Sequence, residues 1–243
     1  MMMSIKIGLL LGILFCGLTD SIAQITTGKI VYERKTNLYK KYKDDGDVQD
    51  WIKQEDKNKT DLFELYFNDS ISVFMPQESE LKEEMSWATS KNVVYQNFNK
   101  NYRLTVKDIW REKLFVEDTL NVRQWKITEN KRVISGYNCR KAIWEADDST
   151  RIYAWYCGEI IPNIGPESFC GLPGAILGIA TEDGGVIYFA KSIEITKPDM
   201  ASLIPKKGKN KIYTTAELKA KLIKDFGKNP WGKAMIKNNF GIW

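Results

Sequence analysis

Short β-rich segments follow one another along most of the chain, and this pattern constrains the fold more than any other feature of the sequence. In the first segment two sets of residues alternate, Ile30, Tyr32, Arg34 and Thr36 on one side and Val31, Glu33 and Lys35 on the other. A period of two places such sets on opposite faces of a strand. Further strands are expected at residues 62–67, 71–75, 93–95, 113–117, 122–128, 141–146 and 151–157.

Two pairs of these segments have the signature of β-hairpins. Residues 62–67 and 71–75 are separated only by the polar turn Asn68-Asp69-Ser70. A stronger signal comes later, where Asp183-Gly184-Gly185 lies between residues 175–177 and 186–190, because Asp-Gly favours the tight turns of hairpins. Both strands of this second hairpin are apolar at nearly every position, so we expect both of their faces to be covered.

Helix signals are few and lie mainly near the C-terminus. Thr214 and Glu217 fit a capping box, and Leu218, Leu222 and Phe226 follow at a spacing of four. With Gly227 as C-cap before Pro230, this predicts a helix of about three turns. A shorter helix is expected over residues 78–87. The sequence thus predicts a mainly β protein: a single domain with a curved antiparallel sheet, half-barrel or sandwich-like, and one or two short helices.

The first 23 residues have the pattern of a signal peptide. Lys6 is followed by the apolar residues 7–18, and Ser21-Ile22-Ala23 supplies small residues at the positions that signal peptidase reads. Twelve apolar residues are too few to span about 30 Å of hydrocarbon. We expect cleavage before Gln24, leaving residues 24–243 as one exported domain that does not span the membrane. Export makes nucleic acid an unexpected partner, and the lysines at 206–211 are interpreted as a solvated linker.

The chain contains no histidine, which excludes several kinds of catalytic site. A Ser-His-Asp triad, a Cys-His pair and an HExxH zinc site all require imidazole. Close carboxylates remain as an alternative, and the candidates are Asp147-Asp148 and Glu182-Asp183. Both pairs lie beside turns, and adjacent strand residues point to opposite faces, so we interpret them as solvated turn residues. No catalytic residue, metal site or cofactor is predicted.

The expected mature chain contains three cysteines, so at most one intramolecular disulfide is compatible with it. Cys157 and Cys170 flank a turn-rich segment with Pro162, Gly165 and Pro166, and we predict a disulfide between them. Cys139 is then expected to be reduced and buried.

One segment is unusually rich in glycine and proline and leads directly into an apolar strand. It comprises residues 165–174, with Gly165, Pro166, Gly171, Leu172, Pro173 and Gly174. Glycine permits backbone angles and close approaches that other residues do not, and proline fixes φ. The segment lacks the spacing of a phosphate loop. We therefore interpret it as a rigid turn that shapes the sheet rather than touches a substrate.

At these residues the chain resembles the GLPGLI family of exported bacterial proteins, with GLPGAI at residues 171–176. The resemblance extends, in the family's order, to Ile134-Ser135-Gly136-Tyr137-Asn138-Cys139-Arg140-Lys141-Ala142, Ala154-Trp155-Tyr156, Ile161-Pro162 and Gly165-Pro166. Residues 63–74 also resemble the family's early hairpin. It implies a place in the periplasm or at the outer membrane, where members often accompany TonB-dependent transport. Cys157 and Cys170 depart from the family pattern.

Two classes of function remain open on the sequence alone. The first is a non-enzymatic envelope protein that binds a partner protein, such as an outer-membrane transport protein, or an apolar ligand within its curved sheet. The second is a periplasmic hydrolase that uses paired carboxylates.

Overall fold

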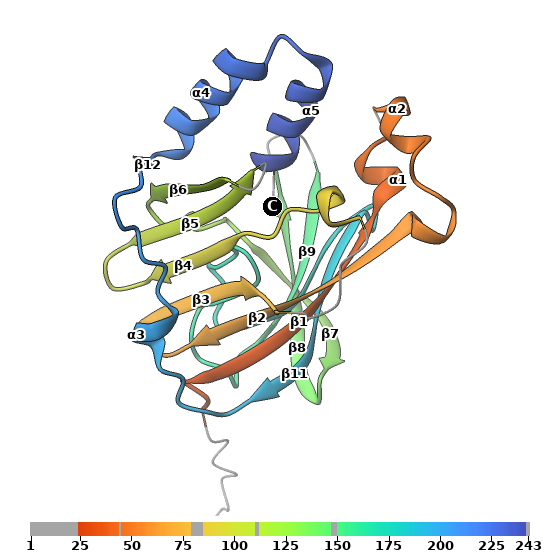
Figure 1. Ribbon diagram of the computed structural model, residues 1–243. Coiled ribbons are helices and arrows are strands. Elements are labelled where there is room, and N and C mark those ends of the chain that lie inside the picture. Colours follow the sequence, from red (N-terminus) through yellow and green to blue (C-terminus); the bar gives the residue numbers. More distant parts are fainter. Residues whose placement is uncertain (1–23, 44, 79–84, 110–111, 147–149, 242–243) are drawn as a thin grey trace, which may run out of the picture.

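In a computed structural model, the chain forms one curved twelve-stranded sheet (Figure 1). The structure describes residues 24–43, 45–78, 85–109, 112–146 and 150–241. The strand order is β12-β6-β5-β4-β3-β2-β1-β11-β10-β9-β8-β7. The described pairings between these strands are antiparallel except that of β12 with β6. The strands are β1 (Gly28–Asn37), β2 (Asn58–Phe67), β3 (Ile71–Pro76), β4 (Val93–Asn97), β5 (Tyr102–Ile109), β6 (Glu112–Asp118), β7 (Lys126–Ile134), β8 (Tyr137–Glu145), β9 (Arg151–Cys157), β10 (Ala175–Thr181), β11 (Val186–Glu194) and β12 (Ile212–Tyr213). The predicted fold class, mainly β with few short helices, is confirmed.

The alternation predicted for β1 fixes which face of the sheet is turned inward. Ile30, Tyr32, Arg34 and Thr36 are buried, whereas Val31, Glu33 and Lys35 are not. Cross-strand partners share a face, so the inner face continues through the pairs Tyr32–Phe63, Leu65–Phe74, Phe74–Val94 and Val94–Thr105. A register shift between Val31 and Tyr32 lies at the centre of the sheet, and such bulges increase the local twist.

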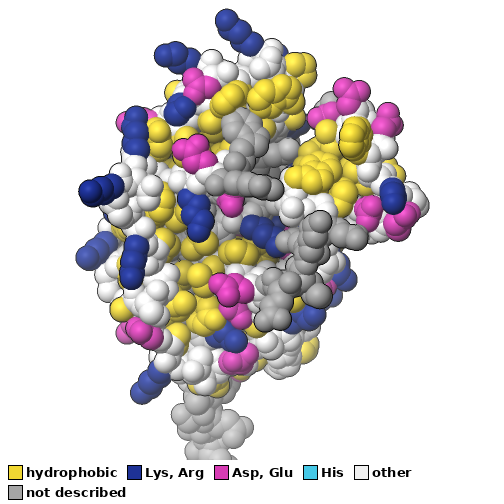
Figure 2. All heavy atoms as spheres, viewed as in Figure 1, with side chains coloured by type: hydrophobic (Ala, Val, Ile, Leu, Met, Phe, Trp, Pro, Cys, Tyr) yellow, Lys and Arg dark blue, Asp and Glu magenta, His cyan; other side chains and the backbone are white. Residues whose placement is uncertain are grey.

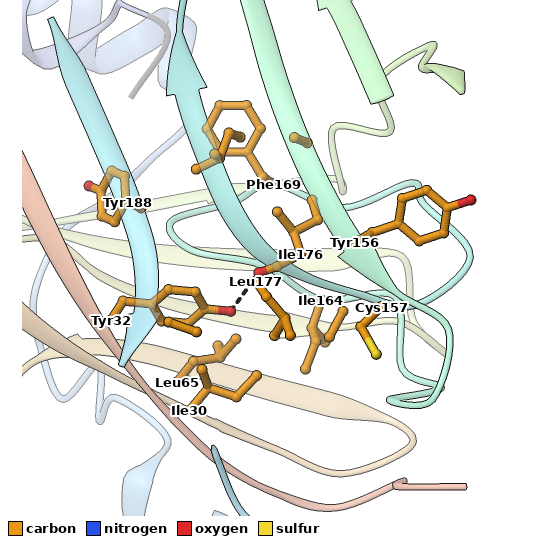
Figure 3. Close-up of a cluster of buried hydrophobic side chains, with 14 of the residues drawn as sticks. Ile30, Tyr32, Leu65, Tyr156, Cys157, Ile164, Phe169, Ile176, Leu177 and Tyr188 are labelled. Atoms are coloured by element: carbon orange, nitrogen blue, oxygen red, sulfur yellow. Dashed lines mark hydrogen bonds between the residues drawn. The ribbon is translucent and has the colours of Figure 1, made fainter. Parts of the chain in front are cut away.

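The apolar core lies on this inner face, where the two ends of the sheet curve toward each other. Tyr32 of β1, Leu65 of β2 and Leu177 of β10 point toward one another and are fully buried (Figure 3). The Tyr32 hydroxyl donates to the backbone carbonyl of Ile176 at 2.7 Å, so a buried polar atom is satisfied inside the core. Burying such side chains is the main favourable contribution to folding.

Both predicted hairpins are present. In the β10–β11 turn, Asp183 accepts a hydrogen bond from the Gly185 amide at 2.8 Å, and Gly184 has φ +68°. The expectation that both strands are covered on both faces holds for β10, which is buried along residues 175–180, but not for β11. Alternate residues of β11 are buried, because only one of its faces lies against the core.

Three strand predictions need correction. The strand β5 was not predicted, although its sequence alternates; its inner residues Arg103, Thr105 and Lys107 resemble a solvated face. The strand expected at 122–128 begins only at Lys126, and β8 begins at Tyr137 rather than at residue 141.

The predicted C-terminal helix is confirmed as α4 (Thr215–Phe226), with both halves of the capping box formed by Thr214 and Glu217. A further helix, α5 (Pro230–Asn239), follows it, because Pro230 occupies the first helical turn instead of ending a helix. Helices α1 (Leu38–Lys41), α2 (Gly46–Gln49) and α3 (Met200–Leu203) are single turns, and η1 (Glu55–Lys57) and η2 (Ser86–Ala88) are 3-10 turns. Most of the helix expected at 78–87 lies outside the described residues.

Within the described ranges, none of the helices combines the length and apolar character needed to cross a membrane.

Candidate functional site

The glycine- and proline-rich loop at residues 165–174 is held against the end of β9. Gly171 and Gly174 have φ angles of +100° and +133°, and a Cβ at Gly174 would lie 2.1 Å from the carbonyl oxygen of Cys157. The Asn163 side chain accepts hydrogen bonds from the amides of Gly171 and Leu172, and Leu172 is buried. A Cβ at Gly165 would lie 2.9 Å from the Phe169 carbonyl oxygen. These positions therefore exclude larger residues by backbone geometry.

The same loop presents one carboxylate to the inner face of the sheet. Glu167 is buried and has φ +55°, a left-handed conformation that is uncommon for a residue with a side chain. Its carboxylate accepts a hydrogen bond from the Tyr188 hydroxyl at 2.8 Å and lies 3.8 Å from Nη1 of Arg34. Such strained residues cluster at functional sites, and this one points into a cavity.

Arg34 is the centre of a buried ionic network on β1 and β2. Its Nη2 lies 2.6 Å from Oδ2 of Asp61, and the other oxygen of Asp61 lies 2.6 Å from Nζ of Lys59. Thr89 also donates to Asp61, at 2.9 Å. Burial disfavours the charged guanidinium, but Tyr188, Asp61 and Glu167 outweigh it and raise the pKa of Arg34 above its usual range.

A cavity of about 540 Å³ opens beside this network. Arg34, Glu167 and Tyr188 form its floor, and further walls come from α1, residues 89–92, the β10–β11 turn and the end of α5. Among the described residues that line it, Val186 is the one aliphatic side chain. In Figure 2, viewed as in Figure 1, basic side chains are visible between the α4–α5 end and the α1–α2 end of the molecule.

The amino group of Lys41, which lines this larger cavity, has a shifted pKa and no ion-pair partner among the described carboxylates. Its Nζ donates to the backbone carbonyl of Ala88 at 2.8 Å and forms no ion pair with any described carboxylate. Burial, reinforced by the positive charge of Arg34, lowers the pKa of Lys41 to about 8. A desolvated, perturbed basic group in a cavity is typical of functional sites.

A smaller cavity of about 170 Å³ adjoins the larger one, and the two share Asn92, Glu167 and Gly241. The inner-face residues Arg103, Thr105 and Lys107 of β5 line it, together with Arg123 and the end of α5. Burial lowers the pKa of Arg123 to about 10 and that of Lys107 below its ordinary value. The two cavities are thus neighbours, and basic side chains line both.

The carboxylate pairs considered from the sequence have other roles or fall outside the description. Glu182 accepts hydrogen bonds from Tyr153 at 2.6 Å and Arg151 at 3.5 Å, and Asp183 is held by Thr181 and by the amide of Gly185. Both line the rim of the larger cavity. Asp147 and Asp148 lie outside the described residues. No cluster of three or more Cys, Asp or Glu residues suited to a metal ion occurs in the part of the chain that the structure describes.

The structure does not form the predicted Cys157–Cys170 disulfide. Both residues are free, buried thiols, as is Cys139. Cys157 ends β9 and pairs with Ala175 of β10, whereas Cys170 lies earlier in the loop and donates to the carbonyl of Asn121 at 3.7 Å. The Cys170 thiol is thus hydrogen-bonded to the segment that precedes β7 and forms no bond to the end of β9. Burial raises the pKa of Cys139 to about 12, which keeps this thiol protonated.

The sequence analysis missed most residues of the site, although one signal pointed to them. Arg34 shares the inner side of β1 with Ile30 and Tyr32. On β2, Lys59 and Asp61 share the period-two set of Phe63, Leu65 and Phe67 in the same way. Charged residues in the buried set of a strand must be paired or bind a ligand, because an unpaired buried charge is costly.

Comparison with known proteins gives a partial family match and a shared fold. Residues 144–178 match the sequence model of a family described as "Protein of unknown function (Porph_ging)". The match runs from the end of β8 into β10 and contains the loop at 165–174. It does not bear on the GLPGLI resemblance, which stays a prediction. No curated protein matches the chain.

Two solved structures of PNGF-II, in the P21 and C2 space groups, are similar to this chain with TM-scores of 0.53 and 0.54. Sequence identity is 18% in both, and the matches cover 78% and 81% of this chain. The chain spans about a third of the length of those structures, 31% and 32% respectively. At this identity the likeness shows a shared fold alone.

Proposed function

We propose that the protein is an exported, non-catalytic binding protein whose larger cavity holds a polar, negatively charged small molecule. Five basic side chains line the cavity, Arg34, Lys40, Lys41, Arg151 and Lys237, against the three carboxylates Glu167, Glu182 and Asp183. Most of its other side chains carry hydroxyl or amide groups, which orient a polar ligand by hydrogen bonds. This replaces the apolar ligand expected from the sequence, because charged and polar side chains make up most of the lining.

Lys41 is the observation that carries the proposal. Lys41 is half-buried, and a partly desolvated ammonium group is costly unless a counter-charge compensates it. Its hydrogen-bond acceptor is a neutral carbonyl, and Asp61, whose charge acts on it, already forms ion pairs with Arg34 and Lys59. An anionic ligand would supply the missing charge and restore the pKa of Lys41 toward its ordinary value. We therefore infer that Lys41 forms an ion pair with an anionic ligand rather than with a described carboxylate.

The non-catalytic part of the proposal is supported by the state of the carboxylates. Glu167 is balanced by Arg34 and Tyr188, and Glu182 is tied to Arg151 and Tyr153. Neither is left as an isolated acid or base of the kind that hydrolysis requires. The periplasmic or outer-membrane location, and a partnership with TonB-dependent transport, rest on the signal pattern and the family resemblance.

The test begins with a thermal-shift screen of sugar acids, dicarboxylates and sugar phosphates. The tightest binder is then measured by calorimetry against the wild type, Lys41→Met and Lys35→Met. Lys35 is the matched control, because it lies on the outer side of β1 and is solvent-exposed. We expect Lys41→Met to weaken binding about tenfold or more, since hydrogen bonds to charged groups contribute about 1.5–3 kcal/mol.

Lys41→Met should at the same time stabilise the fold. Removing a desolvated charge is expected to raise the free energy of unfolding by about 1 kcal/mol at pH 7, as functional sites are often built at a cost in stability. Equal affinities for Lys41→Met and Lys35→Met would contradict the proposal, as would a panel without binders. Chemical conversion of the bound molecule, followed by NMR, would contradict its non-catalytic part.

A further inference from the structure

The smaller cavity is lined by two buried cations that form no ion pair with a described carboxylate. Arg123 and Lys107 are 7% and 8% exposed. Arg123 donates to the carbonyls of Ser168 at 3.2 Å and Asn121 at 3.4 Å, and Lys107 donates to that of Asn239 at 2.7 Å. Carbonyl groups satisfy hydrogen bonds but carry no net charge, and Glu167, the one described carboxylate whose charge acts on Lys107, is already paired with Arg34.

Residues that line this cavity also carry buried polar atoms without hydrogen-bond partners in the described chain, namely two arginine donors and the side-chain oxygens of Asn92 and Asn239. The Nε atoms of Arg123 and Arg103 are buried and have no hydrogen-bond acceptor among the described residues. Arg103 uses its Nη2 for Asp118 at 3.3 Å, and the Arg123 guanidinium lies over the Phe169 ring at 3.8 Å. Because the aromatic ring fixes the plane of the Arg123 guanidinium, its free donor edge is held in a preset orientation.

The carboxylate that lines this cavity is already engaged on its other side. Glu167 lies between the two cavities, where it accepts from Tyr188 and pairs with Arg34. It therefore does not neutralise Arg123 and Lys107 together. The cavity, at about 170 Å³, is several times larger than the roughly 30 Å³ that one water molecule takes up in the liquid. There is room for a small polyatomic anion.

We propose that the smaller cavity is a subsite for one oxyanion, a phosphate, sulfate or carboxylate group, bound by Arg123 and Lys107. Arginine suits this role because its forked donors match the geometry of such groups. The proposal deepens the proposed function and rests on it in one respect. Since the two cavities share Asn92, Glu167 and Gly241, the oxyanion would be the charged end of the molecule in the larger cavity.

The test is a titration of the full protein with inorganic phosphate and with sulfate, at constant ionic strength set by chloride. Calorimetry of the wild type should show one site, and Arg123→Met and Lys107→Met should each weaken it about tenfold or more. Arg132→Met is the matched control, because Arg132 also lies over two aromatic rings, Phe189 and Trp155, but is exposed. Thermal unfolding without phosphate shows whether each variant is folded.

If Arg123→Met does not fold, Lys107→Met and Arg123→Lys decide the question, since Arg123→Lys keeps the charge but lacks the forked donors. Absence of phosphate and sulfate binding in the wild type, or equal weakening by Arg132→Met, would overturn the subsite. Lys41→Met should change the affinity for free phosphate by no more than about twofold. If this variant loses the larger ligand but still binds phosphate, the defect lies in the larger cavity and not in the smaller one. If a sugar phosphate competes with free phosphate, one ligand occupies both cavities. If phosphate binds but a sugar phosphate does not compete with it, the two cavities do not hold the same ligand.

Discussion

At the scale of single residues, the site depends on charged side chains in positions that usually hold apolar ones. Arg34 and Asp61 are cross-strand partners on the inner face, directly above the aromatic part of the core. The period of two predicts their side of the strand, but not whether a charge there is paired. Asp61 pairs with Arg34 directly across the two strands, whereas Glu167 and Tyr188, which complete the network, are far away in the sequence and come close only in the folded chain.

The loop at residues 165–174 leads to a prediction at one glycine. Gly174→Val would combine φ +133° with a Cβ that is 2.1 Å from the Cys157 carbonyl oxygen. We expect a loss of about 3 kcal/mol or more in the free energy of unfolding, since strain at one such position costs about 1–3 kcal/mol before any clash. Chemical denaturation measures it.

Gly184→Ala is the control for this prediction, because Gly184 also has positive φ but nothing within 4 Å of its Cβ position. It should cost about 1 kcal/mol. A Gly174→Val variant that is as stable as the wild type but no longer binds its ligand or partner would show that the loop is a recognition surface instead.

At the scale of secondary-structure elements, prediction succeeded where local signals act alone. The capping box of α4 and the Asp-Gly turn of the β10–β11 hairpin each depend on residues within a few positions of one another. Pro230 was misread because proline is compatible with both the end and the first turn of a helix. The strand β5 was missed because its polar side faces a cavity rather than the core.

Thr214→Ala tests the capping box of α4. Its side chain accepts from the Glu217 amide at 3.2 Å, and Glu217 in turn accepts from the Thr214 amide at 2.8 Å. Loss of an N-cap usually costs about 1 kcal/mol, and hydrogen exchange should localise the effect to the first turn of α4. Thr128→Ala, on the edge strand β7, serves as a comparison for the same substitution outside a helix cap. Unchanged exchange in α4 would mean that packing against α5 and β6 holds the helix without the cap.

At the scale of the whole molecule, local sequence patterns did not predict the order of the strands in the sheet. β1 pairs with β11, so segments more than 150 residues apart are neighbours at the centre of the sheet. That pairing brings Arg34 beside Tyr188 and creates the larger cavity. Curvature was expected from the sequence, but the choice of strand partners follows from the complete core.

Export is a prediction about the whole chain. In an envelope fraction the intact mass should correspond to a chain beginning at Gln24, since the small residues before it fit signal peptidase. A protein that still begins at Met1, or that carries a lipid on Cys16, would contradict the signal-peptide interpretation.

The pH dependence of ligand affinity tests the central claim, an anion bound by Lys41, most directly. The measurement is calorimetry of the tightest carboxylate ligand from pH 6.5 to 9.5, a range in which a carboxylate stays ionised. Because the Lys41 pKa is about 8 in the free protein, affinity should be constant below about pH 7. Above pH 8 it should fall toward tenfold per pH unit as the ammonium loses its proton. Lys41→Met should bind weakly without this dependence. A wild-type affinity that stays constant across the range, or the same profile in Lys41→Met, would contradict the account.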